Sequence, residues 1–283
     1  MKYLFVVLDT IRFFNPHGTL LLFLPCLIAI EFMEINYSVS IKDYVVFFFG
    51  AFLVRSIACV INDLLDRKFD SKVARTKTRP IVSGRISVLG ALLIIITLSI
   101  LALICLLQLN SKAIVAGLFA PFLFASYPLF KRFTYLPQLF LGFCMSYGVV
   151  IVGLHFEHYL SFNVFILFLS MVCWTFGYDT IYAYQDIIDD KKVGVKSSAL
   201  LFGHEGKKYI LLSYIMFLFL TLFVSTRYEL GFLFFVLLNV LGFYILARIQ
   251  FLDLYDIEAC KVEFKQNVYY GFLLYLLILL VKL

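Results

Sequence analysis

Three oxygen-bearing side chains recur at a spacing of four residues between two apolar stretches of the chain: Asn62, Asp66 and Asp70. In an α-helix each step of four residues turns about 40° past a full turn, so the three side chains share one helical face. Carboxylate oxygens suit Mg²⁺, which also takes oxygens from a bound phosphate. Seven cations interleave or follow: Arg67, Lys68, Lys72, Arg75, Lys77, Arg79 and Arg85. The segment 62–85 therefore predicts a site for metal-bound pyrophosphate.

A second acidic segment, residues 177–203, repeats the order of acids followed by bases. Asp179, Asp186 and Asp190 fall at i, i+7 and i+11, on one helical face if the helix continues through them. Asp179 stands in or at the rim of an apolar stretch, where a carboxylate needs a partner or a function. Tyr182 lies beside the same face, and three cations follow: Lys191, Lys192 and Lys196. Two such clusters on one membrane side would hold one pyrophosphate through two Mg²⁺ ions.

The elements that must position these segments are membrane helices. The chain has 283 residues, of which 63% are hydrophobic and 15% charged, whereas soluble domains carry about 25% charged residues. Apolar runs of about 20 residues recur throughout, and such runs are helix-length rather than strand-length. The sequence predicts an all-α, polytopic membrane bundle forming a single domain, 1–283, with nine spans near 18–36, 44–62, 86–107, 112–130, 137–157, 161–182, 209–226, 230–248 and 268–283.

The distribution of cations predicts the orientation of the bundle. Nineteen Lys and Arg residues fall in loops and ends that would share one membrane side, and the other side has four: Lys42, Lys112, Arg227 and Lys282. By the positive-inside rule the N-terminus and both acidic segments face the cytoplasm, and the C-terminus lies outside. The net charge of +6 thus reflects topology, and no nucleic-acid partner is expected.

The first apolar run does not have the form of a cleavable signal, because it contains Asp9, Arg12, Asn15 and Pro16 and no small-residue cleavage site follows it. No Arg- and Ser-rich transit extension is present either, which favours a bacterial inner membrane. The six cysteines are scattered singly, without a C-x-x-C pair, so neither a disulfide framework nor a zinc site is indicated.

The pattern N-D-x-x-D-x-x-x-D followed by R-T-x-x-R-P-x-x-S-G-R resembles the first signature of the UbiA superfamily of membrane prenyltransferases. The second segment, Y-D-T-x-Y-A-x-x-D-x-x-D-D-x-x-x-G-x-K-S, looks like that of the 4-hydroxybenzoate polyprenyltransferase subgroup. Three further stretches support this placement: Arg12 to Pro25, Tyr127 to Gln138, and Cys260 to Gly271. The resemblance covers residues 12–271, as two halves of about 12–130 and 137–271, each with one aspartate motif.

The resemblance implies Mg²⁺-dependent transfer of a polyprenyl group from polyprenyl pyrophosphate to the ring of 4-hydroxybenzoate, in ubiquinone biosynthesis, at a membrane whose lipid holds the tail. The expected catalytic metal ligands are Asp66, Asp70, Asp186 and Asp190, with Asn62. Pyrophosphate would be bound by Arg75, Arg79, Lys131, Lys191 and Lys196, and Arg132 would pair with the acceptor's carboxylate. Asp63, Asp179 and Tyr182 are expected to support the site.

Several alternatives remain open at this point. Arg55, inside the second span, needs either a structural partner or a phosphate contact, whereas the four histidines have no common spacing and receive no role. A related enzyme would use another acceptor, such as a naphthoate, homogentisate or a haem precursor. A transporter would place its charges nearer the membrane midplane on interrupted helices. The clustering of the acids at helix ends favours the enzyme.

Overall fold

The computed structural model describes residues 2–71 and 76–282, and every regular element within those ranges is a helix. A short N-terminal helix, α1 (Lys2–Thr10), precedes the first long one. The other short helices lie at one end of the molecule: α4 (Arg67–Asp70), α9 (Ile187–Val193), α10 (Ser198–Phe202) and the 3₁₀ turn Gly203–Glu205. The prediction of an all-helical protein is confirmed.

Nine helical stretches within the described ranges are long and apolar enough to cross a membrane, as predicted. They are α2 (His17–Glu34), α3 (Ile41–Leu65), α5 (Val88–Leu106), α6 (Ser111–Phe133, apolar to Phe130), α7 (Pro137–Glu157), α8 (Phe162–Tyr184), α10 together with α11 (Gly206–Arg227), α12 (Gly231–Phe251) and α13 (Ile257–Lys282). Polar side chains define several starts: Ser87, Asn110 and Ser161 each accept a hydrogen bond from a backbone N–H in the first turn.

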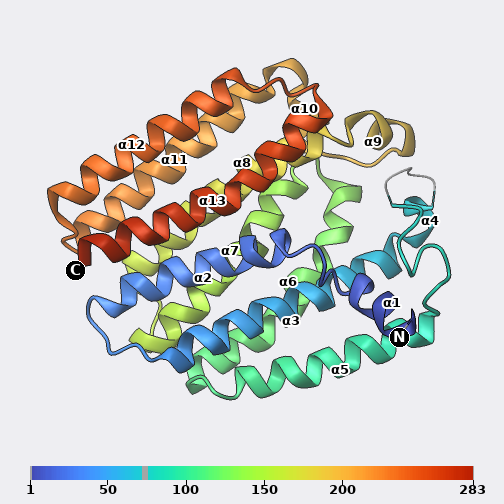
Figure 1. Ribbon diagram of the computed structural model, residues 1–283, viewed down its shortest axis with the longest axis horizontal. Helices are drawn as coiled ribbons and strands as arrows, with labels where there is room; N and C mark the ends of the chain where they lie inside the picture. Colours follow the sequence, from blue (N-terminus) through green and yellow to red (C-terminus); the bar gives the residue numbers. More distant parts are fainter. Residues whose placement is uncertain (1, 72–75, 283) are drawn as a thin grey trace.

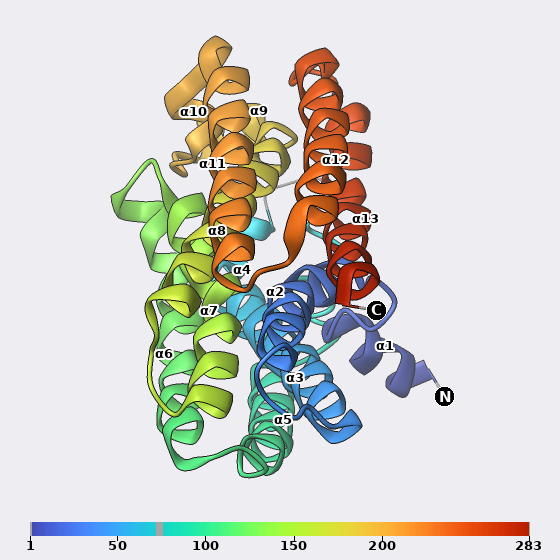
Figure 2. The same ribbon diagram turned by 90° about the vertical axis from the view of Figure 1, so that its left-hand side faces the viewer.

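The long helices run side by side, and the ends that carry the aspartate motifs all lie at the same end of the bundle (Figure 1). Viewed along the helices, α11, α12 and α13 fill one part of the bundle and α3, α5 and α6 the other (Figure 2). Between them, α2 packs against α3, α7 and α13, and α8 packs against α7, α11 and α13. The first and last spans are therefore neighbours, which closes the bundle.

The last span begins at Ile257 rather than near residue 268 as predicted. The first turns of α13, residues 257–267, contain four charged residues, so hydropathy alone does not predict them as part of a membrane span. Glu263 is only 1% exposed, because Arg248 donates two hydrogen bonds to its carboxylate, at 3.0 and 2.7 Å. A buried carboxylate that is paired in this way can stand inside a helix bundle.

A second polar group fixes α13 in the core. Asn267 is fully buried, and its amide oxygen accepts hydrogen bonds from the Trp174 indole at 2.8 Å and the Tyr214 hydroxyl at 2.7 Å. Because these donors come from α8 and α11, one amide ties three helices together. This contact holds α13 against the interior, with Phe264 facing the cavity described next.

Candidate active site

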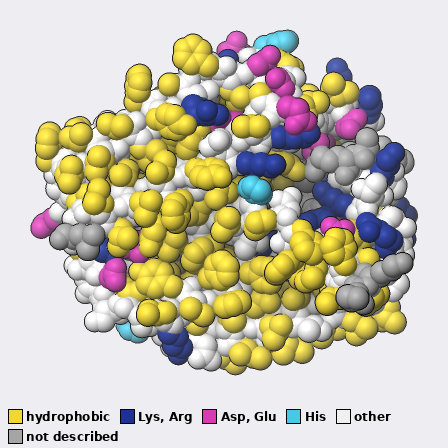
Figure 3. Space-filling model, in the orientation of Figure 1, with side chains coloured by type: hydrophobic (Ala, Val, Ile, Leu, Met, Phe, Trp, Pro, Cys, Tyr) yellow, Lys and Arg dark blue, Asp and Glu magenta, His cyan; other side chains and the backbone are white. Residues whose placement is uncertain are grey.

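A cavity of about 800 Å³ occupies the end of the bundle where α3 and α8 terminate. Its walls include residues of α2, α3, α4, α6, α7, α8, α9 and α13 and of the connection 76–85, so both aspartate segments contribute to one space. Figure 3 shows cations and carboxylates gathered at this end of the molecule, while apolar side chains cover most of the remaining face. The two motif segments, far apart in sequence, are therefore brought together as predicted.

The first motif lies on the last turns of α3 and the short helix α4. Asn62, Asp66 and Asp70 all line the cavity. The helix bends at Asp66, but the i to i+4 backbone hydrogen bonds persist, from Asp66 N to Asn62 O at 2.9 Å and from Asp70 N to Asp66 O at 2.8 Å. The predicted phasing of the three side chains therefore survives the bend.

Asp63 differs from its neighbours in the motif. Its side chain is 1% exposed and sits between two arginines, Arg12 at 2.6 Å and Arg79 at 2.9 Å. Both partners come from distant segments, one before α2 and one after α4. The carboxylate therefore holds the connection 76–85 and the N-terminal segment on the end of α3, and its supporting role in the reaction stays a prediction.

Two arginines lie against carboxylates that the sequence predicts as metal ligands. Arg79 Nη1 donates to Asp70 Oδ2 at 2.9 Å, and Arg132 Nη2 lies 3.9 Å from Asp66 Oδ1. Arg132 is 47% exposed, so it stands at the cavity mouth. These cations face the same space in which a pyrophosphate would have to lie.

The second motif is broken where the sequence allowed for one continuous helix. α8 ends at Tyr184 and α9 begins after Asp186, so Asp179, Asp186 and Asp190 do not share a helical face. A new helix starts instead, with Asp190 N donating to Asp186 O at 2.8 Å in the first turn of α9, and Gly194 ends α9 at φ 77°. All three carboxylates and Tyr182 still line the cavity, with Asp179 almost fully buried.

The predicted phosphate-binding lysines lie in different surroundings. Lys196 lines the cavity, donates to the Phe133 carbonyl at 3.2 Å and stands 5.2 Å from the centre of the Tyr135 ring. Lys191 is exposed on α9 and does not line the cavity. Arg75 and the side chain of Lys131 lie outside the described part of the chain, so their roles stay predictions.

Arg55 is a cavity residue whose role the sequence left open. Its electrostatic neighbours include the Cys59 thiol and the side chains of Tyr182, Tyr127 and Tyr178, and Asp179 lines the same cavity. Gly18 makes room for it, because a Cβ at that position would lie 2.7 Å from Arg55 Nε. This contact gives a physical reason for the glycine in the first stretch of the resemblance.

Other cavity residues were missed from the sequence. Tyr127, Gln138, Phe264 and Lys265 line the wall, as does His17, which the sequence analysis gave no role. The signal for Tyr127, Gln138 and Phe264 was their presence in the stretches that carry the resemblance. Spacing gave no signal for Lys265, because the start of α13 was not recognised as helix.

A second, apolar pocket of about 210 Å³ adjoins the polar cavity. Ala58 and Phe124 line both spaces, so the two pockets lie next to each other at these residues. The apolar pocket extends between α2, α3, α5, α6 and α7, and its wall includes Val54, Ile61, Ala102 and Leu106. An amphipathic molecule with a charged head and a hydrocarbon tail fits this arrangement.

The donor chemistry of the polar cavity suits a hard divalent cation. Five side chains of the two motifs, Asn62, Asp66, Asp70, Asp186 and Asp190, present only oxygens and amide groups to it. Within residues 2–71 and 76–282 no three His, Cys, Asp or Glu side chains stand close enough to hold one ion by themselves. Oxygens of a bound phosphate would complete such a coordination sphere, as is usual for Mg²⁺.

Residues 22–277 match the model of the UbiA prenyltransferase family. The chain belongs to this family. UbiA relatives include the 4-hydroxybenzoate octaprenyltransferase of Histophilus somni (strain 2336), 36% identical over 274 residues, which are 95% of this chain and 93% of the relative. The enzyme of the same name from Francisella tularensis subsp. novicida (strain U112) is 32% identical over 266 residues, 94% of this chain and 93% of the relative.

Solved structures of UbiA homologues share the fold. The apo form of a UbiA homologue from Aeropyrum pernix K1 superposes with a TM-score of 0.75 at 21% identity, over 93% of this chain and 98% of the other. A homologue from Archaeoglobus fulgidus bound to GPP and Mg²⁺ gives a TM-score of 0.64 at 19% identity, over 95% and 99% of the two chains. At these identities the likeness concerns the fold.

Proposed function

We propose that this UbiA family member transfers a polyprenyl group from polyprenyl pyrophosphate to the ring of 4-hydroxybenzoate, with Mg²⁺, in ubiquinone biosynthesis. The observation that carries the proposal is a cavity lined by both aspartate motifs with an apolar pocket next to it, in a chain 36% identical to a 4-hydroxybenzoate octaprenyltransferase. The pyrophosphate head would lie in the first space and the start of the isoprenoid tail in the second.

The acidic and the basic side chains would bind different parts of the metal-bound donor, the metal ions and the phosphate oxygens. Asn62, Asp66, Asp70, Asp186 and Asp190 would hold Mg²⁺, which neutralises the charge that the pyrophosphate gains as it leaves. Arg79 and Lys196 line the same cavity, and we assign them to the phosphate oxygens. Arg132, 3.9 Å from Asp66, is close enough to the proposed metal site to assist them.

The reaction itself exchanges one bond for another. The C–O bond of the allylic pyrophosphate breaks, a ring carbon of the phenol forms a bond to the allylic carbon, and the ring proton leaves to a carboxylate or water in the cavity. The allylic cation must be kept from water while it exists. Phe124, Leu141 and Phe264 line the cavity and would shield the cation.

The acceptor's carboxylate needs a cation inside this space, because an unpaired charge in a low-dielectric cavity is strongly unfavourable. The sequence favoured Arg132, which is 47% exposed and lies beside Asp66. Arg55 is less exposed, on α3 inside the cavity and near Tyr127, Tyr178 and Tyr182, where a carboxylate could pair with its guanidinium. We therefore propose Arg55 for the acceptor and keep Arg132 as the alternative.

The orientation is part of the proposal. With the cation-rich loops in the cytoplasm of a bacterium, the cavity would open toward the cytoplasm, where 4-hydroxybenzoate dissolves, and the membrane would be the inner one. The cavity lies at the same end of the bundle as the basic connection 76–85 and α9, which supports this arrangement (Figure 1).

The test is an assay of membranes with Mg²⁺, 4-hydroxybenzoate and allylic pyrophosphates. Asp66→Asn and Asp190→Asn should each lower turnover by about two orders of magnitude or more, the loss typical of removing a main electrostatic stabiliser. Glu205→Gln is a matched control, because Glu205 is an exposed carboxylate that does not line the cavity. Near-normal turnover of either aspartate variant, or turnover in excess EDTA, would refute the proposal.

A further inference from the structure

An aromatic cluster stands exposed beside the N-terminal helix, outside the nine spans. Phe5, Phe13 and Phe14 are 59%, 52% and 54% exposed. The rings of Phe5 and Phe14 stack at 4.8 Å between centroids, and Phe13 meets Phe14 edge-on at 5.6 Å. The three rings form one exposed apolar patch with Phe14 in the middle, and Phe14 also borders the polar cavity. An exposed apolar patch of this kind marks a surface that contacts another apolar surface.

The opposite side of this segment is fixed to the bundle. Val6, Val7 and Leu8 pack on a small core that contains Val60 of α3 and Ile86 before α5. The aromatic cluster, Phe5, Phe13 and Phe14, is therefore presented from a segment that is already held in place. Its exposure does not come from a loose chain end.

The aromatic cluster continues a surface that faces lipid. The Phe13 ring lies 6.2 Å from that of Phe52 on α3. From Phe52, the residues at i−3, i−4 and i−7 are Phe49, Phe48 and Val45, which lie on one helical face and are 50%, 38% and 46% exposed. Since α3 has the length and hydropathy of a membrane span, this face meets acyl chains, and the cluster extends it at the end where the cavity opens.

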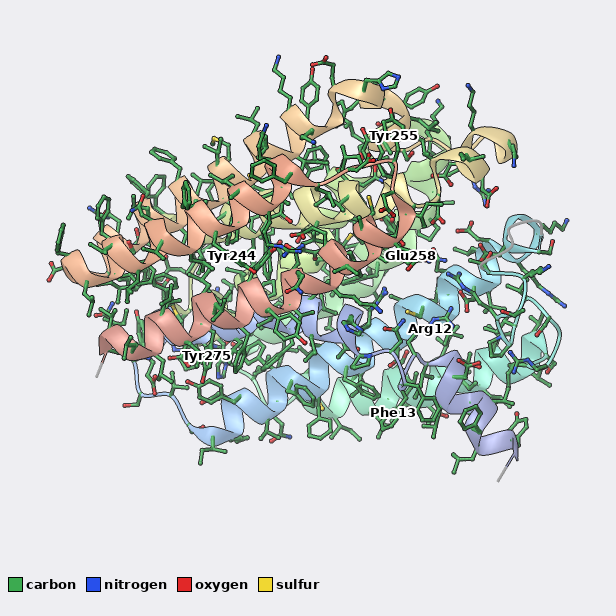
Figure 4. The ribbon with its side chains drawn as sticks, turned by 45° about the horizontal axis from the view of Figure 1, so that its top comes forward. Arg12, Phe13, Tyr244, Tyr255, Glu258 and Tyr275 are labelled. Carbon is green, nitrogen blue, oxygen red and sulfur yellow. The ribbon has the colours of Figure 1, made fainter. Side chains whose placement is uncertain are left out.

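The residue before Phe13 points the other way. Arg12 has φ 60°, a left-handed backbone conformation that non-glycine residues rarely adopt. As a result, Arg12 faces the cavity and Phe13 faces outward (Figure 4). Arg12 donates to Asp63 at 2.6 Å, and Asp63 also accepts from Arg79, which bonds Asp70. The aromatic cluster thus lies one residue away from an ion-pair chain that ends at a proposed metal ligand.

We propose that Phe5, Phe13 and Phe14 insert into the phospholipid surface at the headgroup boundary, and that this contact positions Arg12 on Asp63. Phenylalanine is among the apolar side chains that membrane-surface helices bury at the boundary between headgroups and acyl chains. A bilayer is the partner because the aromatic cluster runs directly into the lipid-facing surface of α3. The lipid contact stands whether or not the transfer reaction is the one proposed, and only its effect on KM rests on that reaction.

The lipid contact is tested with Phe13→Trp in vesicles of phosphatidylethanolamine and phosphatidylglycerol that carry brominated acyl chains. The native Trp174 is fully buried and gives a constant background. Tyr255→Trp is the control, because Tyr255 is 51% exposed in a polar loop between Asp253 and Asp256. We expect the added fluorescence of Phe13→Trp to be quenched several-fold more than that of Tyr255→Trp. Equal quenching of the two overturns the proposal.

The positioning role is tested with Phe13→Ser in the same vesicles without bromine. Its KM for the prenyl pyrophosphate should rise several-fold, while Phe13→Trp and the control Tyr255→Ser keep the native KM. Full rescue by tryptophan separates lipid anchoring from a general loss of fold. If Phe13→Ser keeps the native KM, the link from the lipid contact to Arg12 is overturned. If Phe13→Ser does not fold, a raised KM for Phe5→Ser, at a position that is exposed and does not line the cavity, supports the same link and a native KM overturns it.

Discussion

Arg79 Nη1 lies 2.9 Å from Asp70 Oδ2, so a proposed metal ligand is held by a guanidinium in this structure. The same nitrogen lies 2.9 Å from Asp63 Oδ1. Asp63 is fixed from its other side by Arg12, whereas Asp70 has only one turn of α4 behind it. A metal-bound pyrophosphate would therefore compete with the Arg79–Asp70 ion pair. Its metal would bind the Asp70 carboxylate, and its phosphate oxygens would bind the Arg79 guanidinium.

Removing the guanidinium of Arg79 should weaken donor binding selectively. A hydrogen bond to a charged group contributes about 1.5–3 kcal/mol, so Arg79→Gln should raise the KM for the prenyl pyrophosphate by about tenfold or more. The KM for 4-hydroxybenzoate should change little. Both are measured from initial rates in reconstituted vesicles.

Lys77→Gln is the matched control for that variant. It removes one cation from the same connection, but Lys77 is exposed and does not line the cavity. An equal rise in donor KM for the two variants would show that the net charge of the loop matters, and not the Arg79 contact.

The assignment of the acceptor's carboxylate makes a second prediction. Arg55→Ala should raise the KM for 4-hydroxybenzoate about tenfold or more, since a desolvated, charge-assisted pair is lost. It should also reduce discrimination against phenols that lack the carboxylate, because their binding never used the cation. Arg132→Ala, at the more exposed position, is expected to act mainly on the donor.

The two arginine variants are compared on both substrates in one series. If Arg132→Ala shows the acceptor defect and Arg55→Ala does not, the carboxylate binds at the cavity mouth, as the sequence analysis had it. A loss shared equally by phenols with and without a carboxylate would remove both arginines from acceptor recognition.

Much of the fold and part of the site follow from the sequence, because the signals are local. Apolar runs of helix length predict the spans, and acids at a spacing of four residues predict which side chains meet at the end of α3. The break after Tyr184 has no such signal. Residues 184–187 are Tyr, Gln, Asp and Ile, which tolerate helix, so the turn into α9 is set by tertiary contacts.

The remaining features depend on contacts between distant segments. Asp63 accepts hydrogen bonds from Arg12 and Arg79, which are 51 and 16 residues away in the sequence. Helical spacing predicts contacts only between residues three or four apart, so it does not predict these two. The early start of α13 is hidden for a related reason, since Glu263 reads as a surface residue until Arg248 is placed beside it. Its burial therefore becomes evident only in the structure.

The Arg248–Glu263 pair predicts a specific stability pattern. Arg248→Ala leaves a carboxylate that is 1% exposed without its cation, and should lower the free energy of unfolding by about 3 kcal/mol. The Tyr270 hydroxyl also donates to the Glu263 carboxylate, so the triple variant Arg248→Met/Glu263→Leu/Tyr270→Phe removes both charges without leaving that hydroxyl unpaired, and it should recover most of the loss. Thermal unfolding in detergent, followed by circular dichroism, gives the comparison. A triple variant no more stable than Arg248→Ala would contradict the prediction.

The orientation of the bundle is testable by labelling. If the cavity faces the cytoplasm, an impermeant maleimide applied to intact cells should modify Lys112→Cys and spare Lys192→Cys. Both positions are exposed on the protein and lie at opposite ends of the bundle, so their accessibility differs only through the membrane. The reverse pattern would place the cavity on the outer side and overturn the proposed localisation.

The apolar pocket predicts which donors the enzyme accepts. Gly50 lines this pocket, and a Cβ at its position meets no atom within 4 Å, so a larger side chain there would project into open pocket space. Replacing a glycine inside a helix does not weaken the helix, since glycine itself is unfavourable there by roughly 0.5–1 kcal/mol. Gly50→Leu should therefore fold normally while shortening the space for the isoprenoid tail.

We expect the kcat/KM of Gly50→Leu for octaprenyl pyrophosphate to fall about tenfold or more. Its kcat/KM for geranyl pyrophosphate should stay near the native value. The loss of a few well-packed methylene contacts is sufficient for such discrimination. Phe49→Leu is the control, because Phe49 is the adjacent residue, is 50% exposed toward lipid and lines neither cavity. An equal loss toward both donors in Gly50→Leu would place the tail outside this pocket, along another face of the bundle.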